Sequence, residues 1–155
     1  MTQTGRRAMV RLVLVIVALG VSLVMSAGPA TATAPNVQAG LSLSPTTAGV
    51  GTAVHVVATA TNLTDVTITQ VSMGVDIPAT LGYGGLVRPA HATCRATFVT
   101  NHRLVYCSTS LAPHETATLG FTVTPSVPGS FTLRAYARQT YTTNDTFATA
   151  TLTVS

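Results

Sequence analysis

The chain has 155 residues, which leaves room for one domain of ordinary size once a leader is removed. A hydrophobic content of 46% with only 8% charged residues excludes a disordered, highly charged chain and favours a packed core. The formal net charge of +4 comes mostly from three Arg before residue 12, and the other Arg residues are scattered without forming a patch with aromatic residues, which argues against a nucleic-acid partner.

The first 34 residues have the three parts of a secretory signal peptide. Arg residues come first, the apolar run 12–25 follows, and two overlapping Ala-x-Ala sites end at Ala32 and Ala34. A membrane-spanning helix needs about 20 apolar residues, so this run is short for a permanent anchor. We therefore expect cleavage at Ala32 or Ala34, with membrane contact only before cleavage. The Arg6-Arg7 pair leaves both the general secretory and the twin-arginine routes open.

The rest of the chain alternates apolar and polar residues with a period of two, which is the pattern of a half-buried β-strand. In one such segment Ala117, Leu119, Phe121 and Val123 form the apolar face, and mostly Thr forms the other. Turn residues such as Gly, Pro, Asn and Asp separate the segments. The predicted strands are 41–44, 54–61, 66–77, 93–99, 103–108, 116–124, 131–138 and 148–154.

Short alternating strands without crossover helices favour two packed antiparallel sheets. No segment between them has the 3.6-residue spacing of an amphipathic helix. We therefore expect an all-β, antiparallel immunoglobulin-like β-sandwich of about seven to eight strands. It would be formed by residues 35–155, after a signal peptide of residues 1–34.

Cys94 and Cys107 are the only two cysteines. A tight turn centred on residues 100–101 places them directly opposite each other, and the same register pairs Phe98 with Arg103. Export brings the pair into an oxidising compartment. We expect a structural disulfide. The alternatives, a reactive thiol or a metal pair, lack a CxxC spacing and a converging set of His ligands.

The segment 78–93 is a long stretch without a strand pattern and is the candidate binding loop. It carries Tyr83 and Leu86 between and beside glycines, followed by Arg88 and His91. Binding residues often lie on loops that a rigid scaffold holds. We therefore expect these four residues to contact a ligand if the loop is the functional surface.

Residues that supply chemistry elsewhere do not form a recognisable site here. The four His are spread over the chain, whereas structural zinc needs about four convergent ligands. Asp65 and Asp145 could meet at one end of a sandwich, but calcium prefers six to eight oxygens. No Ser lies in a G-x-S-x-G motif. We predict no catalytic residue, no metal site and no cofactor; Asn62 fits either an N-glycosylation site or a turn.

Several local patterns occur in a defined order along 41–154. An Asn-containing turn at 60–65 leads to Asp76-Ile77-Pro78, the two cysteines precede the turn at 111–114, and Asn144-Asp145 precedes the last strand. In this order the chain resembles the conserved-repeat Ig-like domain of bacterial surface proteins, domain-of-unknown-function family eleven. The resemblance implies an Ig-like fold, a bacterial cell surface and no catalysis. His114 stands where that family usually has Gly.

These features predict a noncatalytic secreted or envelope-associated Ig-like module with a structural or interaction role. Its expected partner is a cell-envelope component or a secreted protein. The alternative is a secreted small-ligand binder or protease inhibitor that acts through the 78–93 loop. A small secreted hydrolase is the third candidate.

Overall fold

The structure is a computed structural model that describes residues 34–142 and 144–155. The predicted signal peptide, including the cleavage site at Ala32, lies outside these residues, and Ala34 is exposed at their beginning. No helix in the described part of the chain is long and apolar enough to cross a membrane.

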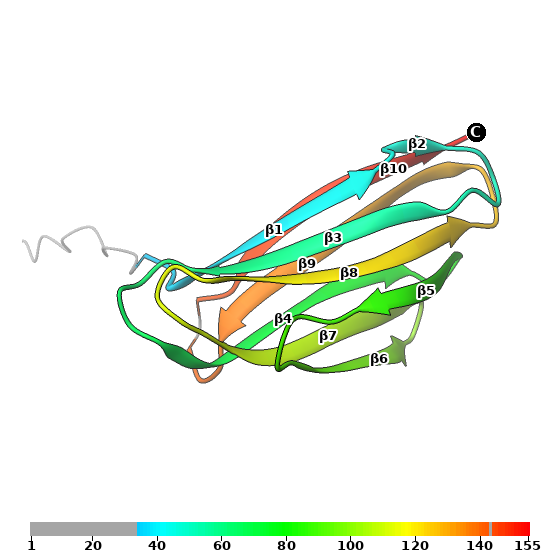
Figure 1. Cartoon of the computed structure of the whole chain (residues 1–155). Helices are drawn as coiled ribbons and strands as arrows, with labels where there is room; N and C mark the ends of the chain where they lie inside the picture. The colour runs from blue at the N-terminus through cyan, green and yellow to red at the C-terminus, as the bar shows by residue number, and fades with distance from the viewer. Residues whose placement is uncertain (1–33, 143) are drawn as a thin grey trace, which may run out of the picture. The chain divides into compact units, whose positions relative to one another are not determined.

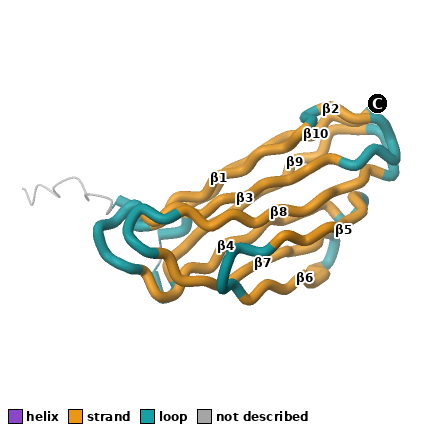
Figure 2. Tube along the Cα trace, viewed as in Figure 1, coloured by secondary structure: helices purple, strands orange, loops and turns teal. Residues whose placement is uncertain are grey.

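Two β-sheets form the domain, and they stack face to face (Figure 1). The smaller sheet has the strand order β1-β3-β8-β5, and the larger has the order β2-β10-β9-β4-β7-β6. Strands and loops account for the whole described trace (Figure 2). The strands are β1 (Val37–Ser44), β2 (Thr47–Ala48), β3 (Val54–Asn62), β4 (Ile68–Pro78), β5 (Leu81–Val87), β6 (Thr93–Val99), β7 (His102–Leu111), β8 (Thr116–Pro125), β9 (Gly129–Gln139) and β10 (Thr146–Val154).

The alternation in the sequence decides which face of each strand is buried. On β8 the four apolar residues Ala117, Leu119, Phe121 and Val123 are buried, as predicted, and the Thr residues between them face outward. The same alternation holds along β3 and β9. Burying apolar area contributes roughly 25 cal/mol per Å². The core between the sheets is therefore the main source of stability.

The predicted all-β Ig-like sandwich is confirmed, but the described residues form ten strands rather than about seven to eight. The two additional strands are β2, a two-residue element inside a predicted turn, and β5, which lies inside the predicted binding loop. Gly82, Gly84 and Gly85 hide β5 from pattern recognition, because glycine is rare in strands and breaks the alternation. One pairing is parallel, β10 with β2, and the others are antiparallel.

The predicted disulfide hairpin is confirmed. Cys94 and Cys107 are bonded, and β6 pairs with β7 in the predicted register, including Phe98 opposite Arg103. The bridge links β6, an edge strand of the larger sheet, to β7, its one paired strand among the described residues. It therefore holds in place a strand that has few other contacts.

Candidate functional site

One side of the sandwich is closed. There β1, an edge strand of the smaller sheet, lies beside β10 of the larger sheet. The Thr146 hydroxyl links the two strands: it accepts a hydrogen bond from the Ala39 N–H (2.9 Å) and donates to the Val37 carbonyl oxygen (3.0 Å). The end of β10 is covered in turn by β2, since the Thr153 N–H donates to the Thr46 carbonyl oxygen (2.9 Å). This side therefore carries cross-sheet hydrogen bonds and a capping strand that the other side lacks among the described residues.

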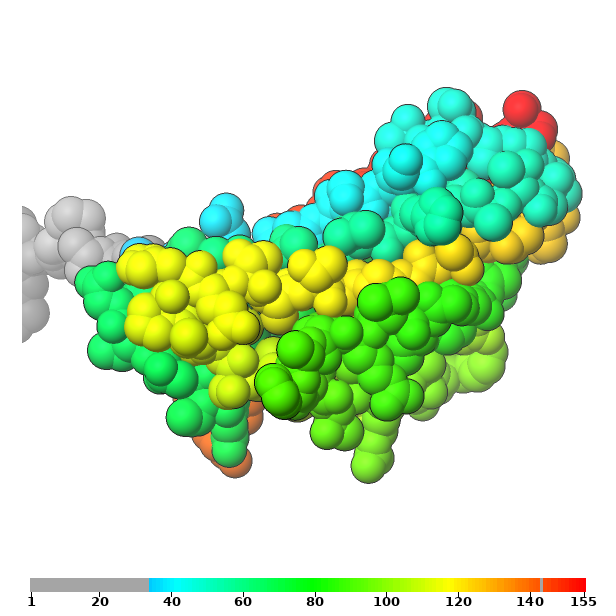
Figure 3. All heavy atoms as spheres, viewed as in Figure 1, coloured from blue at the N-terminus to red at the C-terminus, as the bar shows by residue number. Residues whose placement is uncertain are grey.

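The opposite side is open. Here β5 ends the smaller sheet and β6 ends the larger one, and both lie along the lower side of the molecule in Figure 1. Apart from the disulfide residue Cys94, every side chain of β6 is exposed. In the space-filling view the residues of β5, in green, form the border of the smaller sheet, and atoms in the colour of β6 and β7 are visible beyond them (Figure 3). We call this region, formed by β5 and β6, the open side.

An aromatic and cationic stack joins the two sheets at the open side. The Arg103 guanidinium of β7 lies 4.3 Å from the ring centroid of Phe98 on β6 and 5.0 Å from that of Tyr83 on β5. The Tyr83 ring packs in turn on Phe121, with ring centroids 5.5 Å apart. Cation–π contacts of this kind contribute about 0.5–1 kcal/mol each where they are exposed. Phe98 itself is 66% exposed, so the outer end of the stack faces solvent.

The hydroxyl group of Tyr83 lacks a hydrogen-bond partner among the described residues of this stack. The oxygen of this group is buried and has no hydrogen-bond partner anywhere in the part of the chain that the structure describes. Burial raises the pKa of Tyr83 above its usual 10.0, against the opposing effect of the cations Arg103 and Arg88. A buried donor without a partner costs free energy, so this hydroxyl destabilises the folded domain.

Arg103 lacks a carboxylate partner among the described residues. Three of the four acids have basic partners elsewhere: Asp76 lies near His102, Asp65 bonds to His114, and Asp145 lies near Arg138. The fourth, Glu115, accepts a hydrogen bond from the Ala112 N–H. Arg103 is half-buried as a residue, whereas Arg88, Arg95, Arg134 and Arg138 are exposed, so an external carboxylate paired with Arg103 would be screened least by solvent.

The four residues predicted for a binding loop have different surroundings. Tyr83 and Leu86 belong to β5 and pack against the core rather than on a loop, which corrects the prediction of an irregular segment over 78–93. The register of β5 with β8 shifts between Gly84 and Val87, so the strand is irregular. Arg88 and His91 follow β5 and are exposed. A ligand role for these four residues remains a prediction; Tyr83 is the one that the structure brings into the stack.

Phe98 and Arg103 were not predicted as site residues. Their pairing across the hairpin follows from the cysteine register, and Tyr83 was identified separately by its position between glycines. The missing information was that β5 of one sheet lies over β7 of the other. That proximity depends on the packing of two sheets and has no local sequence signal.

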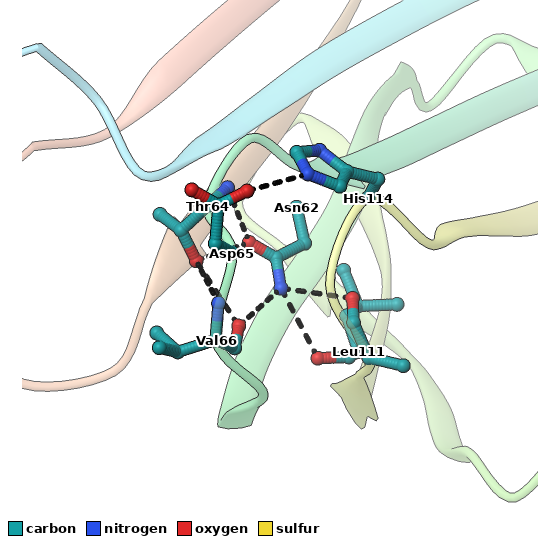
Figure 4. Close-up of polar contacts among 7 residues, drawn as sticks. Asn62, Thr64, Asp65, Val66, Leu111 and His114 are labelled. Atoms are coloured by element: carbon teal, nitrogen blue, oxygen red, sulfur yellow. Dashed lines mark hydrogen bonds and ion pairs between the residues drawn. The ribbon is translucent and has the colours of Figure 1, made fainter.

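The Asn62 side chain, a candidate glycosylation site, is bound into the fold by hydrogen bonds. Asn62 is fully buried, and its Nδ2 donates to the carbonyl oxygens of Val66 (2.8 Å), Leu111 (3.2 Å) and Ala112 (2.9 Å), while its Oδ1 accepts from the Thr64 N–H (2.9 Å; Figure 4). The amide nitrogen is thus used by the fold, which favours the turn interpretation over a glycan site. Across residues 34–142 and 144–155 no three of the His, Cys, Asp and Glu side chains gather into a metal-ligand group.

His114 occupies a turn that suits glycine. Its backbone φ is +59°, in the left-handed region that favours Gly. Its Nε2 lies 2.9 Å from an Asp65 carboxylate oxygen, and this exposed contact is visible in Figure 4. The position at which the family resemblance expects Gly therefore has the corresponding backbone conformation.

Two of the Arg residues that looked scattered in the sequence lie beside aromatic rings on a second surface, contrary to the expectation of no such patch. On the outer face of the larger sheet, the register places Phe147, Tyr136, Gly74 and Tyr106 in one row across β10, β9, β4 and β7. Arg134 lies 3.7 Å from the Phe147 ring centroid. These residues are far apart in sequence, and only the strand pairing brings Arg and aromatic side chains together. We call this the aromatic row.

The fold and the open side together define an Ig-like β-sandwich module. No family model matches the chain, and no curated protein matches it in sequence. Among solved structures, it is similar to the CARDB domain of PF1109 from Pyrococcus furiosus, in complex with di-metal ions (TM-score 0.56, 17% identity, 78% of this chain and 89% of that one). It is also similar to a cohesin module of a family 33 glycoside hydrolase from Clostridium perfringens (TM-score 0.59, 10% identity, 78% and 98%).

A third similar structure is AvmM, which catalyses macrocyclisation in alchivemycin A biosynthesis (TM-score 0.50, 10% identity, 78% of this chain and 89% of that one). At such identities these likenesses show the fold alone. The same sandwich occurs in proteins with different roles, so the fold by itself does not determine the function.

Proposed function

We propose that this chain is a noncatalytic, secreted or envelope-associated Ig-like module that binds another exported protein through its open side. The observation that carries the proposal is the Phe98–Arg103–Tyr83 stack, which joins a half-buried cation without a carboxylate to a buried hydroxyl without a partner. The Arg103 guanidinium gains from a carboxylate supplied by a second molecule.

The composition of the open side also favours a protein partner. Tyr and Arg are among the residues that dominate binding energy at protein interfaces, and Phe is enriched there. At the open side these residue types lie beside two strand edges, whereas the opposite side of the sandwich is closed. The asymmetry favours one binding side on this domain.

Export is supported by the disulfide. Structural disulfides persist in oxidising compartments and are rare in the cytosol. The Cys94–Cys107 bridge and the signal-peptide pattern of residues 1–34 are independent features, and both favour secretion.

Fractionation of cells that produce the full chain tests the proposal. We expect the mature protein in the medium or the envelope fraction, with an intact mass that corresponds to loss of the leader and of two thiol hydrogens. Arg103→Gln should release it from its exported partner in co-purification, while Arg134→Gln, on the outer face of the larger sheet, should not. Equal retention of both variants contradicts binding at the open side, and a cytosolic protein with free thiols contradicts the proposed location.

A further inference from the structure

We propose that β6 accepts an extended segment of the partner as an additional antiparallel strand, and that a Glu on this segment reaches Arg103. The inference rests on the proposed function and specifies the chemistry of the same site. It combines a free strand edge, a cation without a carboxylate and an edge on the other sheet that is unsuited to pairing.

The free backbone groups of β6 follow from the disulfide pair. Cys94 and Cys107 have Cα atoms 4.1 Å apart, which is the short spacing of a non-hydrogen-bonded antiparallel pair. In such a pair the N–H and C=O groups point away from the neighbouring strand. Because the pattern repeats every two residues, Cys94, Ala96 and Phe98 direct their backbone groups toward the unpaired edge. An added strand finds there a regular ladder of donors and acceptors.

β6 lacks most of the features that protect strand edges. Natural edges are commonly blunted by Pro, by bulges, by charge or by very short length. β6 has seven residues, no Pro, one charged residue and a continuous register with β7. β5 differs, because Gly85 has φ +63° and the register with β8 shifts beside it. Of the two edges at the open side, β6 is the one suited to strand addition.

The position of Arg103 selects the chemistry of the added strand. Its guanidinium lies over the Phe98 ring, on the face of β6 that points between the sheets. A residue of the added strand opposite Phe98 is two strand spacings from Arg103, about 10 Å between backbones. Extended Arg and Glu side chains together span this distance. A carboxylate there meets a cation whose other surroundings are aromatic, where a charge-assisted hydrogen bond is stronger than at an exposed pair.

A second copy of this chain is not the occupant that the charges favour. Pairing β6 with its own copy would bring Cys94, Ala96 or Phe98 to the inner side and no carboxylate to Arg103. The partner strand therefore belongs to a different sequence, with alternating β-forming residues and one Glu on the inner side.

Two synthetic peptides test the proposal on the mature, disulfide-bonded protein. Both are nine-residue alternating Thr/Val sequences with blocked ends, one with a central Glu and the other with Gln at that position. By titration calorimetry we expect the Glu peptide to bind about tenfold more tightly than the Gln peptide. In Arg103→Gln the two should bind equally, while Arg95→Gln, on the other face of β6, should retain the discrimination.

The backbone part of the proposal has its own controls. Ala96→Pro removes an N–H that faces the open edge and should abolish binding of both peptides. Since this variant could also fail to fold, the same question is asked of the ligand: methylation of alternate peptide nitrogens, in the register that faces β6, should abolish binding to the unaltered protein. Binding that survives methylation overturns strand addition, as does equal binding of the Glu and Gln peptides to the unaltered protein, or a dimer that forms through β6 in sedimentation.

The two assays distinguish a failure of strand addition from a failure of the proposed function. If neither peptide binds but Arg103→Gln still releases the exported partner, strand addition is wrong and the proposed function stands. If Arg103→Gln affects neither assay, both are wrong.

Discussion

Tyr83→Phe is expected to stabilise the domain, which is an unusual outcome for a change at a packed aromatic residue. The variant removes only the hydroxyl oxygen, which is buried and has no hydrogen-bond partner among the described residues. The ring contacts with Phe121 and Arg103 are retained. The folded state therefore loses an uncompensated polar group and keeps its packing.

The size of the effect follows from the cost of such a group. A buried, unsatisfied donor or acceptor costs about 1–3 kcal/mol. Tyr83 as a whole is only partly buried, so the lower end applies and we expect a gain of about 1 kcal/mol. For a domain of this size that corresponds to a rise in Tm of roughly 3–5 °C.

Thermal and urea unfolding followed by circular dichroism measure the gain. Tyr141→Phe is the matched control, because Tyr141 is 93% exposed and its hydroxyl is free to bond to water. It should leave Tm unchanged. A loss of stability in Tyr83→Phe would show that the hydroxyl has a partner in the free protein and would refute the packing argument.

The same residue predicts a dependence on alkaline pH. Burial raises the pKa of Tyr83 in the folded state above the 10.0 of the unfolded chain. Because the folded state holds this proton more tightly than the unfolded state, the free energy of unfolding is unaffected below pH 10. It falls as the pH rises through the folded-state pKa of Tyr83. In Tyr83→Phe the fall in the free energy of unfolding above pH 10 should be shallower than in the unaltered protein.

Three further changes test the fold. Replacing Cys94 and Cys107 by Ser opens a bridge with a sequence separation of 13 and should cost about 3 kcal/mol, read as a lower urea midpoint, and an unchanged midpoint would mean that β6 is held by other contacts. Asn62→Asp replaces an amide that donates to three backbone carbonyl oxygens by a group that repels them, so we expect a loss of more than about 3 kcal/mol at neutral pH and a smaller loss in acid; equal stability at both would contradict the network. Gly74→Ala places a Cβ 2.7 Å from both the Tyr136 ring and the Val105 carbonyl oxygen, and should cost about 1–3 kcal/mol, read as a lower Tm. An unchanged Tm would contradict this close packing of the outer face.

Much of the sandwich can be predicted because each strand buries one face. The run of apolar residues at every second position on β3 and β8 is sufficient to predict both the strands and their inner faces. The disulfide register is equally local, since the two cysteines are equidistant from one turn. β5 was missed because its glycines remove the side chains on which the alternation depends.

The candidate site depends on contacts that are distant in sequence. Tyr83 and Arg103 are brought together by the stacking of two sheets, and the difference between the open and the closed side depends on the positions of β2 and Thr146. No window of sequence contains these relations. The sequence shows the residue types. It does not show the strand order that leaves Arg103 without a carboxylate partner among the described residues.

A photo-crosslinking residue at position 98, in cells that export the protein, is the most direct test of binding at the open side. If the open side binds an exported protein, a discrete adduct forms with the crosslinker in place of Phe98, and its yield falls several-fold when Arg103→Gln is combined with it. An adduct whose yield is unaffected by Arg103→Gln, or the absence of any adduct at position 98 when a crosslinker at position 147 on the aromatic row captures one, would contradict the account.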